Sequence, residues 1–465
     1  MTTDRRFRQC ALGAVIGSAA GDALGAPFEF QPAGTYGRRF PEPVLGGIGE
    51  QIGGGGFGWA PGEVTDDTQM AIIQAQSLLE HTGIDGADLF ERFRIWARTA
   101  GDVGNQTRAA LASGLPWDQA AAAYFEQHPS NSAGNGGLMR ATPSAVYFAQ
   151  HDLAVSMQAA RELTAITHGD PAAQWGAALF HAMIHAALRG DDPFAALDAV
   201  LVGLPGDQVR FVEMLAPGWT PDRGGPSNGS VWGCLAQAVW AVRSTTTFED
   251  ALVAAVQLGD DADTVAAVTG GLAGAVYGVQ ALPSRWTTYL HARIPGREET
   301  FRSVDLQELT LRLLGQVPAP EHPAGAPIGP TEIVPGLYAA NLSGAATVPT
   351  GYAVISLCRV DDLFREHPIR RELYVIDQEA DHNAALGAMV RDAVDSIDAF
   401  HAEGLLVVLH CHGGASRTGL VLRAWLMRTN GWDEPTATQF LEDRWPTLGL
   451  WNESFTEFLR TAWAR

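Results

Sequence analysis

Lysine is absent from the sequence, so all 31 basic residues are arginine. Without an amine side chain the chain has no Walker A phosphate loop, no kinase-type nucleotide lysine and no Schiff-base or pyridoxal chemistry. Cysteine is rare as well: Cys10, Cys234, Cys358 and Cys411 lie far apart, with no CxxC spacing. This pattern excludes a disulfide scaffold and a thiolate zinc site, and we expect a reducing, cytoplasmic location.

Positive charge is also scarce, since 31 basic residues face 52 acidic ones and the formal net charge is -21. Such a chain repels a phosphate backbone or an anionic membrane, so we expect no membrane partner, and nucleic acid only as a modified substrate. The apolar runs Ala11 to Ala20 and Thr264 to Leu282 are interrupted by glycine. We expect buried helices there, rather than a signal peptide or a membrane span.

The composition changes at residues 316–331, where five prolines lie among alanine and glycine. No helix or central strand persists through such a stretch. We therefore predict one domain over residues 1–316, a proline-rich linker over 317–330 and a second domain over 331–465. Helical spacing of apolar residues predicts an all-α first domain. Short apolar runs at 353–357, 373–376 and 405–409 alternate with helical patterns and predict a small α/β second domain with a mainly parallel sheet.

Two acidic segments of the first domain each precede an apolar helix. They are Thr65-Asp66-Asp67-Thr68 and Asp260-Asp261-Ala262-Asp263-Thr264. Either segment alone is typical of a helix cap, but five aspartates exceed what two caps require. If the two helix starts meet in space, the carboxylates of these aspartates repel one another unless divalent cations neutralise them. Oxygen ligands without cysteine or histidine suit Mg²⁺ or Mn²⁺, and there are enough of them for two ions.

These segments occur in order with the motifs Gly21-Asp22-Ala23-Leu24-Gly25-Ala26-Pro27-Phe28-Glu29-Phe30 and Gly134-Asn135-Gly136, the latter followed by Met139-Arg140. Together the motifs resemble the ADP-ribosylglycohydrolase family over about Met1 to Leu314. The resemblance implies an all-helical domain in which two Mg²⁺ or Mn²⁺ ions engage the ribose and water replaces the target at the anomeric carbon. Asp260, where many relatives have glycine, is not assigned to the metal. The implied metal ligands are Thr65, Asp66, Asp67, Asp261, Asp263 and Thr264.

The same resemblance implies further site residues. Glu29 and Asp102 are the acidic residues expected to approach the scissile ribose, and which of them is the general base stays open. The glycine-rich turn before Arg140 is suited to present backbone N–H groups to a diphosphate. We interpret His168 as a surface or satisfied histidine and give it no role. The expected substrate-binding residues of this domain are Asn135, Gly136, Gly137 and Arg140.

In the second domain, the apolar run 405–409 leads into the loop His410-Cys411-His412-Gly413-Gly414-Ala415-Ser416-Arg417-Thr418-Gly419, and an apolar helix follows. Strand, glycine-rich loop and helix in this order aim backbone N–H groups and the helix dipole at one anion and favour a thiolate at Cys411. Arg417 is placed to grip two phosphate oxygens. The loop residues expected to bind phosphate are His412, Gly413, Gly414, Ala415 and Ser416.

This loop resembles that of the cysteine-based phosphatases, particularly the compact dual-specificity type, and the resemblance covers about Thr331 to Arg465. It implies that Cys411 attacks phosphorus, that Arg417 holds the phosphoryl oxygens and that Thr418 donates to the departing thiolate. The implied general acid is Asp381, with Asp377 as the second choice.

The sequence therefore predicts a bifunctional hydrolase: an ADP-ribosylglycohydrolase-like domain followed by a phosphatase-like domain. The expected partners are an ADP-ribosylated protein or small molecule and a phosphorylated substrate. One compound, such as a phosphorylated ADP-ribose, would allow both domains to act in turn. Two alternatives stay open: a binding module in which one or both domains lack turnover, and hydrolysis of another N- or O-glycoside at the carboxylate site.

Overall fold

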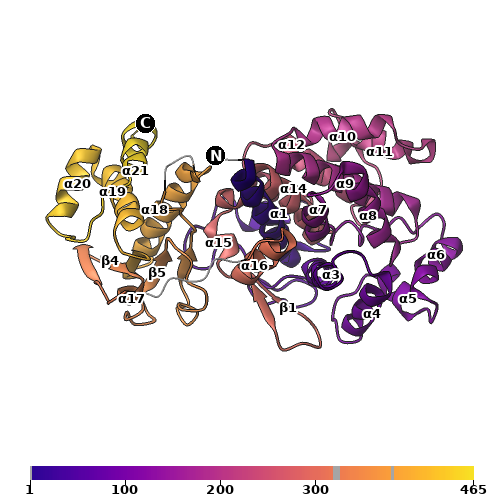
Figure 1. Ribbon diagram of the computed structural model, residues 1–465, viewed down its shortest axis with the longest axis horizontal. Helices are drawn as coiled ribbons and strands as arrows, with labels where there is room; N and C mark the ends of the chain where they lie inside the picture. Colours follow the sequence, from indigo (N-terminus) through magenta and orange to yellow (C-terminus); the bar gives the residue numbers. More distant parts are fainter. Residues whose placement is uncertain (1–2, 318–324, 379–381, 465) are drawn as a thin grey trace.

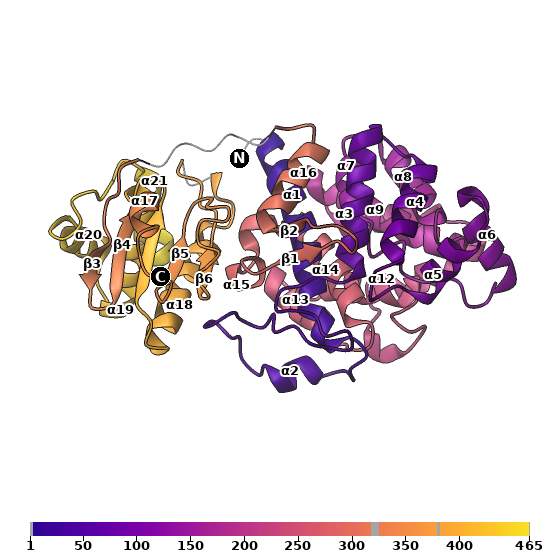
Figure 2. The same cartoon turned by 90° about the horizontal axis from the view of Figure 1, so that it is seen from below.

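The computed structural model describes residues 3–317, 325–378 and 382–464. It contains a large helical body and a smaller body built around a sheet, with α15 (Ser284–Thr287) between them (Figures 1 and 2). The largest hydrophobic core takes its residues from Cys10 to Leu314, and the next from Ile333 to Leu459. The predicted fold classes of both parts are confirmed. The predicted domain boundaries stay predictions, because part of the proposed linker lies outside the described residues.

The helical body also contains a short antiparallel hairpin of β1 (His291–Arg293) and β2 (Thr300–Arg302). Strands of three residues are too short to show the alternation that predicts a strand, so these two strands were not predicted. The longer helices of this body are α1 (Thr3–Gly25), α3 (Asp66–His81), α4 (Gly86–Ala97), α5 (Asn105–Ala112), α6 (Trp117–Gln127), α8 (Leu153–Ala165), α9 (Pro171–Arg189), α10 (Pro193–Val202), α12 (Val231–Arg243), α13 (Phe248–Val256), α14 (Ala262–Tyr277) and α16 (Ser303–Leu313). Shorter helices are α2 (Thr35–Arg39), α7 (Thr142–Phe148) and α11 (Val209–Met214).

Helices α1 and α14 pack side by side in this body (Figure 1). Their backbones touch through glycine: a Cβ added at Gly17 would lie 2.5 Å from the oxygen of Gly270, and one added at Gly13 would lie 2.3 Å from that of Gly274. By length and composition alone α1 is apolar enough to cross a membrane, but 89% of its most apolar window is buried inside the protein. The close packing sets the C-terminal end of α1 beside the start of α14.

The smaller body has a five-stranded sheet in the order β3-β4-β7-β5-β6. Strand β3 is antiparallel to β4, and the other pairs are parallel. The predicted strand at 373–376 is wrong: the edge strand covers residues 370–372. The N–H of Leu373 still donates to the oxygen of Ser356 at 2.8 Å, and the oxygen of Val375 then accepts a hydrogen bond from Arg417. The strands are β3 (Thr331–Val334), β4 (Leu337–Asn341), β5 (Ala353–Ser356), β6 (Arg370–Glu372) and β7 (Val407–Cys411), and the helices are α17 (Leu342–Ala345), α18 (Leu386–Ala402), α19 (Ser416–Asn430), α20 (Glu434–Glu442) and α21 (Glu453–Phe458).

Candidate active sites

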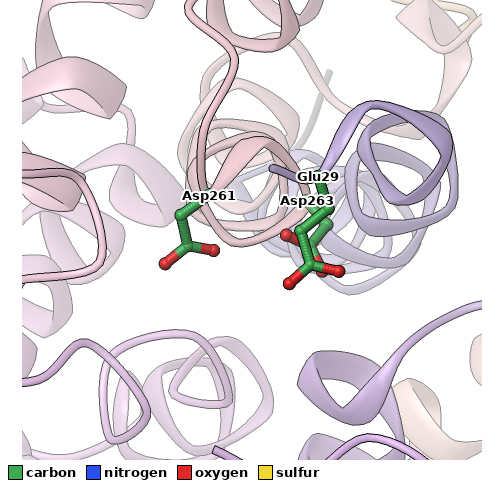
Figure 3. Close-up of side chains that lie close together, drawn as sticks. All are labelled: Glu29, Asp261 and Asp263. Carbon is green, nitrogen blue, oxygen red and sulfur yellow. The ribbon is translucent and has the colours of Figure 1, made fainter. Parts of the chain in front are cut away.

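The two acidic helix starts of the helical body meet in space. Thr264 at the start of α14 donates a hydrogen bond from Oγ1 to Asp67 Oδ1 at the start of α3, at 3.3 Å. Glu29, Asp261 and Asp263 each offer a carboxylate oxygen, and these oxygens all lie within 4.8 Å of one another (Figure 3). The two acidic helix starts therefore lie together, as a shared metal site requires.

Asp22, near the end of α1, fixes the start of α3. Its carboxylate accepts hydrogen bonds from the backbone N–H of Thr65 at 2.9 Å and of Thr68 at 3.1 Å, and from the Thr68 hydroxyl. Burial raises the pKa of Asp22 to about 6, although these hydrogen bonds act to lower it. In the sequence Asp22 is only one residue of a motif, because its contact with α3 spans more than forty residues. Asp22 is thus a positioning residue for the helix that carries Asp66 and Asp67.

A cavity of about 560 Å³ opens over the acidic cluster. The predicted residues that line it are Glu29, Asp66, Asp67, Asp102, Asn135, Gly136, Asp261, Asp263 and Thr264. Thr65 caps α3 beneath it, accepting the N–H of Asp67 at 3.3 Å. Gly137 packs against Thr164, where an added Cβ would lie 2.3 Å from Thr164 Cγ2. Most of the predicted set therefore shares one cavity, and these two residues form its support.

The carboxylates of the cavity raise one another's pKa values. Burial raises the pKa of Glu29 to about 8, and the charges of Asp102, Asp261 and Asp22 add to the effect. The pKa of Asp263 is raised well above its usual range, again by burial first and then by neighbouring carboxylates. Buried negative charges that repel one another need a counter-charge.

Three buried oxygens of this cluster have no hydrogen-bond partner among the described residues: Glu29 Oε2, Asp67 Oδ2 and Asp263 Oδ1. Buried polar atoms are rarely left unpaired, so these oxygens indicate a missing ligand. A hard divalent cation fits this donor set, because Mg²⁺ and Mn²⁺ prefer carboxylate and hydroxyl oxygens.

Asp102 lies on the loop before α5 and reaches the same cavity. Burial raises its pKa, while a side-chain hydrogen bond with Asp66 acts to lower it. The two acidic candidates, Glu29 and Asp102, therefore lie on one cavity, each with its pKa raised.

Asn135 orients a candidate metal ligand. Its Nδ2 donates to Asp261 Oδ2 at 2.7 Å and to the backbone oxygen of Asn228 at 3.0 Å. Asn228 Oδ1 in turn accepts the N–H of Asp261 at 3.2 Å. Asn135 thus holds the carboxylate of Asp261, and Asn228 holds its backbone N–H. The predicted substrate contact of Asn135 stays a prediction.

Arg140 is fully buried behind the cavity wall. Its guanidinium donates to the oxygen of Gly136, to the oxygen of Leu163 at 3.1 Å and to Thr167 Oγ1 at 2.8 Å. Arg140 therefore supports the turn at Gly136 from inside the protein, and its predicted contact with substrate stays a prediction.

His168, which was given no role, lines the cavity. It is buried, and burial together with the charge of Arg140 lowers its pKa to about 3. The imidazole is thus neutral at physiological pH. No spacing in the sequence links His168 to the acidic segments, so only the fold reveals its place.

Two exposed aromatic rings stand at the mouth of the cavity. Phe30 and Phe57 are 65% and 42% exposed, and their ring centroids lie 6.4 Å apart. Phe30 has φ +61° and Asp260 has φ +57°, a backbone region that side chains other than glycine rarely adopt. The N–H of Phe30 donates to the oxygen of Asp260 at 2.6 Å. This strained junction connects the residues that follow Glu29 with those that precede Asp261.

In the smaller body, β7 ends at Cys411 and α19 begins at Ser416, so the predicted strand, loop and helix are confirmed. Gly414 has φ +64°, and an added Cβ would lie 2.8 Å from the Asn341 nitrogen. The oxygen of Gly414 accepts hydrogen bonds from Trp445 Nε1 at 2.8 Å and Thr447 Oγ1 at 3.3 Å. Neighbouring elements therefore hold the loop in its curled shape.

Arg417 lies beside this loop with its guanidinium against two backbone oxygens, those of Leu357 at 3.3 Å and Val375 at 3.2 Å. Its Nε is 3.7 Å from Asp377 Oδ2. The hydroxyls of Ser416 and Thr418 are buried and have no partner among the residues that the structure describes. Donors left free at a helix start suit an anion. Asp381, the first choice for the general acid, lies outside the described residues.

Comparison with known proteins decides the family. A family model described as ADP-ribosylglycohydrolase matches residues 2–322, more than half of the chain. This chain belongs to the ADP-ribosylglycohydrolase family. A second model, described as the catalytic domain of dual specificity phosphatases, matches residues 353–463. The protein is thus a hydrolase with a phosphatase domain, and the two matches support a bifunctional hydrolase.

Several relatives share the first domain. ADP-ribosylarginine hydrolase Tri1 of Pseudomonas putida (strain GB-1) is 32% identical over 333 residues, which cover 66% of this chain and 82% of that protein. ADP-ribosyl-[dinitrogen reductase] glycohydrolase of Rhodospirillum rubrum is 31% identical over 297 residues, covering 63% and 94%. A solved structure titled ADP-ribosylglycohydrolase-related protein complex has 35% identity and a TM-score of 0.53, covering 67% of this chain and 98% of that one.

Proposed function

We propose that the glycohydrolase domain releases ADP-ribose from modified arginine side chains at a site with two divalent cations, and that the phosphatase domain hydrolyses a phosphate monoester through Cys411. The observation that carries the first part is the meeting of the α3 and α14 starts, which gathers unpartnered carboxylate oxygens in one cavity. The residues that would hold Mg²⁺ or Mn²⁺ are Thr65, Asp66, Asp67, Asp261, Asp263 and Thr264.

Arginine as the modified residue is supported by two observations. Relatives of about 30% identity are named ADP-ribosylarginine hydrolases. The cavity also combines acidic side chains with the exposed rings of Phe30 and Phe57 at its mouth. Carboxylates and aromatic faces both attract a guanidinium group.

In the first site the cations would supply charge, and the residues of the chain would transfer protons and hold the groups in position. Bound divalent cations supply positive charge that orients the ribose hydroxyls and polarises water. Glu29 and Asp102 are placed to move protons, because both line the cavity and burial raises the pKa of each. Asn135 and Asp22 keep Asp261 and the α3 start in position.

In the second site, the Cys411 sulfur forms a bond to phosphorus as the ester oxygen leaves with a proton from Asp377 or Asp381. Arg417 holds the phosphoryl oxygens of the resulting thiophosphate. Water then attacks phosphorus and gives a proton back to the same aspartate, the sulfur–phosphorus bond breaks, and the Thr418 hydroxyl donates a hydrogen bond to the released thiolate. The buried and unpartnered Thr418 Oγ1 supports this role.

The test is a panel of substrates carrying ADP-ribose on arginine, on serine or on a nucleic-acid base, incubated with purified protein with and without chelator. We expect release from arginine that depends on Mn²⁺ or Mg²⁺ and is lost in Asp261→Ala. Tight binding without release by the unaltered protein would support the binding-module alternative. Hydrolysis of an aryl phosphate, lost in Cys411→Ser, tests the second domain in the same preparation.

We further propose that the protein works in the cytoplasm. All four cysteines are free and buried, which suits a reducing compartment. Fractionation of cells that produce the protein, followed by immunodetection, tests this location.

A further inference from the structure

We propose that Gln280, a residue of the glycohydrolase domain, is a positioning residue for the phosphatase site. Through Asn383 it fixes the segment that begins at Ile376 and carries Asp377. The inference rests on the proposed phosphatase activity of the second domain. Its consequence is that this activity depends on the neighbouring domain.

The contact lies in the interface between the two bodies. Gln280 follows α14 and donates from Nε2 to Asn383 Oδ1 at 2.9 Å. Both side chains are buried, with 6% and 3% exposure. Within the described residues Gln280 Oε1 has no hydrogen-bond partner, so the bond to Asn383 is what orients this amide.

The side chain of Asn383 binds the backbone of Ile376. Its Oδ1 accepts the N–H of Ile376 at 2.8 Å, and its Nδ2 donates to the oxygen of Ile376 at 2.8 Å. One side-chain amide therefore satisfies both backbone groups of Ile376. The carbonyl oxygen Oδ1 of Asn383 can accept two hydrogen bonds, and Gln280 Nε2 donates the second. This bond fixes the orientation of the Asn383 amide.

The segment so held forms a wall of the phosphatase site. Arg417 contacts the oxygen of Val375, and its Nε lies 3.7 Å from Asp377 Oδ2. Asn452 holds the other side of Asp377, donating from Nδ2 to Oδ1 at 3.3 Å and to the oxygen of Gln378 at 2.7 Å. A shift of Ile376 would therefore move Asp377 relative to Arg417.

The glycohydrolase domain also supports the strand that leads into this segment. Thr288 Oγ1 accepts the N–H of Glu372 at 3.0 Å, and the Tyr289 hydroxyl accepts that of Arg370 at 3.0 Å. Figure 2 shows β6 as the strand of the sheet nearest the helical body, with α15 beside it. The strand β6 and the residues up to Asp377 are thus held between Arg417 on one side and the glycohydrolase domain on the other.

The experiment compares two substrates in the full-length protein. Gln280→Met keeps the length of the side chain and removes the donor. The test takes Asp377 as the general acid. Its displacement slows hydrolysis of phenyl phosphate, whose leaving oxygen needs a proton, far more than hydrolysis of p-nitrophenyl phosphate, whose leaving group departs as an anion. We expect kcat on phenyl phosphate to fall about tenfold or more, with KM nearly constant and little change on p-nitrophenyl phosphate.

The matched control is Ser284→Ala, which removes a hydroxyl that donates to Asp392 at 3.0 Å elsewhere in the same interface. It should leave the ratio of the two rates unchanged, and both variants should keep full ADP-ribose release. Gln280→Leu, whose side chain has no donor, should repeat the selective loss if the methionine variant folds poorly.

An equal loss on both substrates in both Gln280 variants, or no loss on either, would refute the positioning role. Phosphatase activity that is absent from the unaltered protein would instead refute the proposed function on which the inference rests.

Discussion

Divalent cations should stabilise the helical domain against heat. A ligand present at 100 times its Kd adds about 2.7 kcal/mol to the free energy of unfolding. In a domain of this size, each kcal/mol raises Tm by roughly 2–4 °C. Mn²⁺ at this ratio in one of the two cation sites should therefore raise Tm by about 5–10 °C near pH 8, and occupation of both sites by roughly twice as much.

The size of this shift should depend on pH, because the folded, metal-free cavity raises carboxyl pKa values. The pKa of Glu29 is about 8 and that of Asp22 about 6, mainly through burial. Both carboxyl groups bind protons more tightly in the folded than in the unfolded state. The metal-free fold therefore loses stability as pH rises from about 4, the usual carboxyl pKa, toward the raised pKa values. Metal ligands must be deprotonated to bind. The Tm shift should accordingly be larger near pH 8 than near pH 5.5.

Differential scanning fluorimetry with and without Mn²⁺ measures this shift at both pH values. Asp263→Asn removes a ligand and a repelling charge, so it should raise the metal-free Tm near pH 8 and abolish the response to Mn²⁺. Asp260→Asn is the control: Asp260 is exposed, and asparagine tolerates its left-handed backbone. A shift that is equal at both pH values, or that persists in Asp263→Asn, would refute the reasoning.

Three further predictions follow from single contacts. Asn135→Ala removes a hydrogen bond to Asp261 and should weaken Mn²⁺ binding about 10- to 100-fold in calorimetry; unchanged affinity would contradict the assigned role. Gly270→Ala should lower the free energy of unfolding by about 1–3 kcal/mol in urea, because its Cβ would lie 2.0 Å from the oxygen of Gly17 and this clash outweighs the usual helical gain of up to about 1 kcal/mol. Gly206→Ala, with nothing within 4 Å of its Cβ, is the control, and a stabilised Gly270 variant would contradict the packing. Gly414→Ala should reduce aryl phosphate hydrolysis about 100-fold or more while ADP-ribose release continues; full phosphatase activity would show that the loop tolerates a side chain there.

The sequence predicted the fold classes because local patterns determine them. Helical spacing, the proline-rich stretch and the strand-loop-helix order around Cys411 are all readable within about twenty residues. The edge strand was misplaced because residues 373–376 form an irregular segment that still buries Leu373 and Val375 in the core of the smaller body, and not a strand of its sheet. An apolar run in a sequence predicts burial, but it does not distinguish a buried irregular segment from a strand.

The site was predicted less completely, because several of its contacts span long stretches of chain. Repeated acidic helix starts indicated the cluster, yet the role of Asp22 depends on a contact with Thr65, and that of Asn135 on one with Asp261. His168 and the ring of Phe57 join the cavity only through folding. The bond between Gln280 and Asn383 connects two domains, and no single-domain pattern contains it.

The most direct measurement is a crystal structure of the Mn²⁺-soaked protein with anomalous scattering recorded at the manganese edge. We expect two manganese peaks per chain in the cavity, bound by the carboxylates Asp66 and Asp67 of α3 and by Asp261 and Asp263 at the start of α14. A cavity without anomalous density, or manganese bound only at other surfaces, would contradict this expectation.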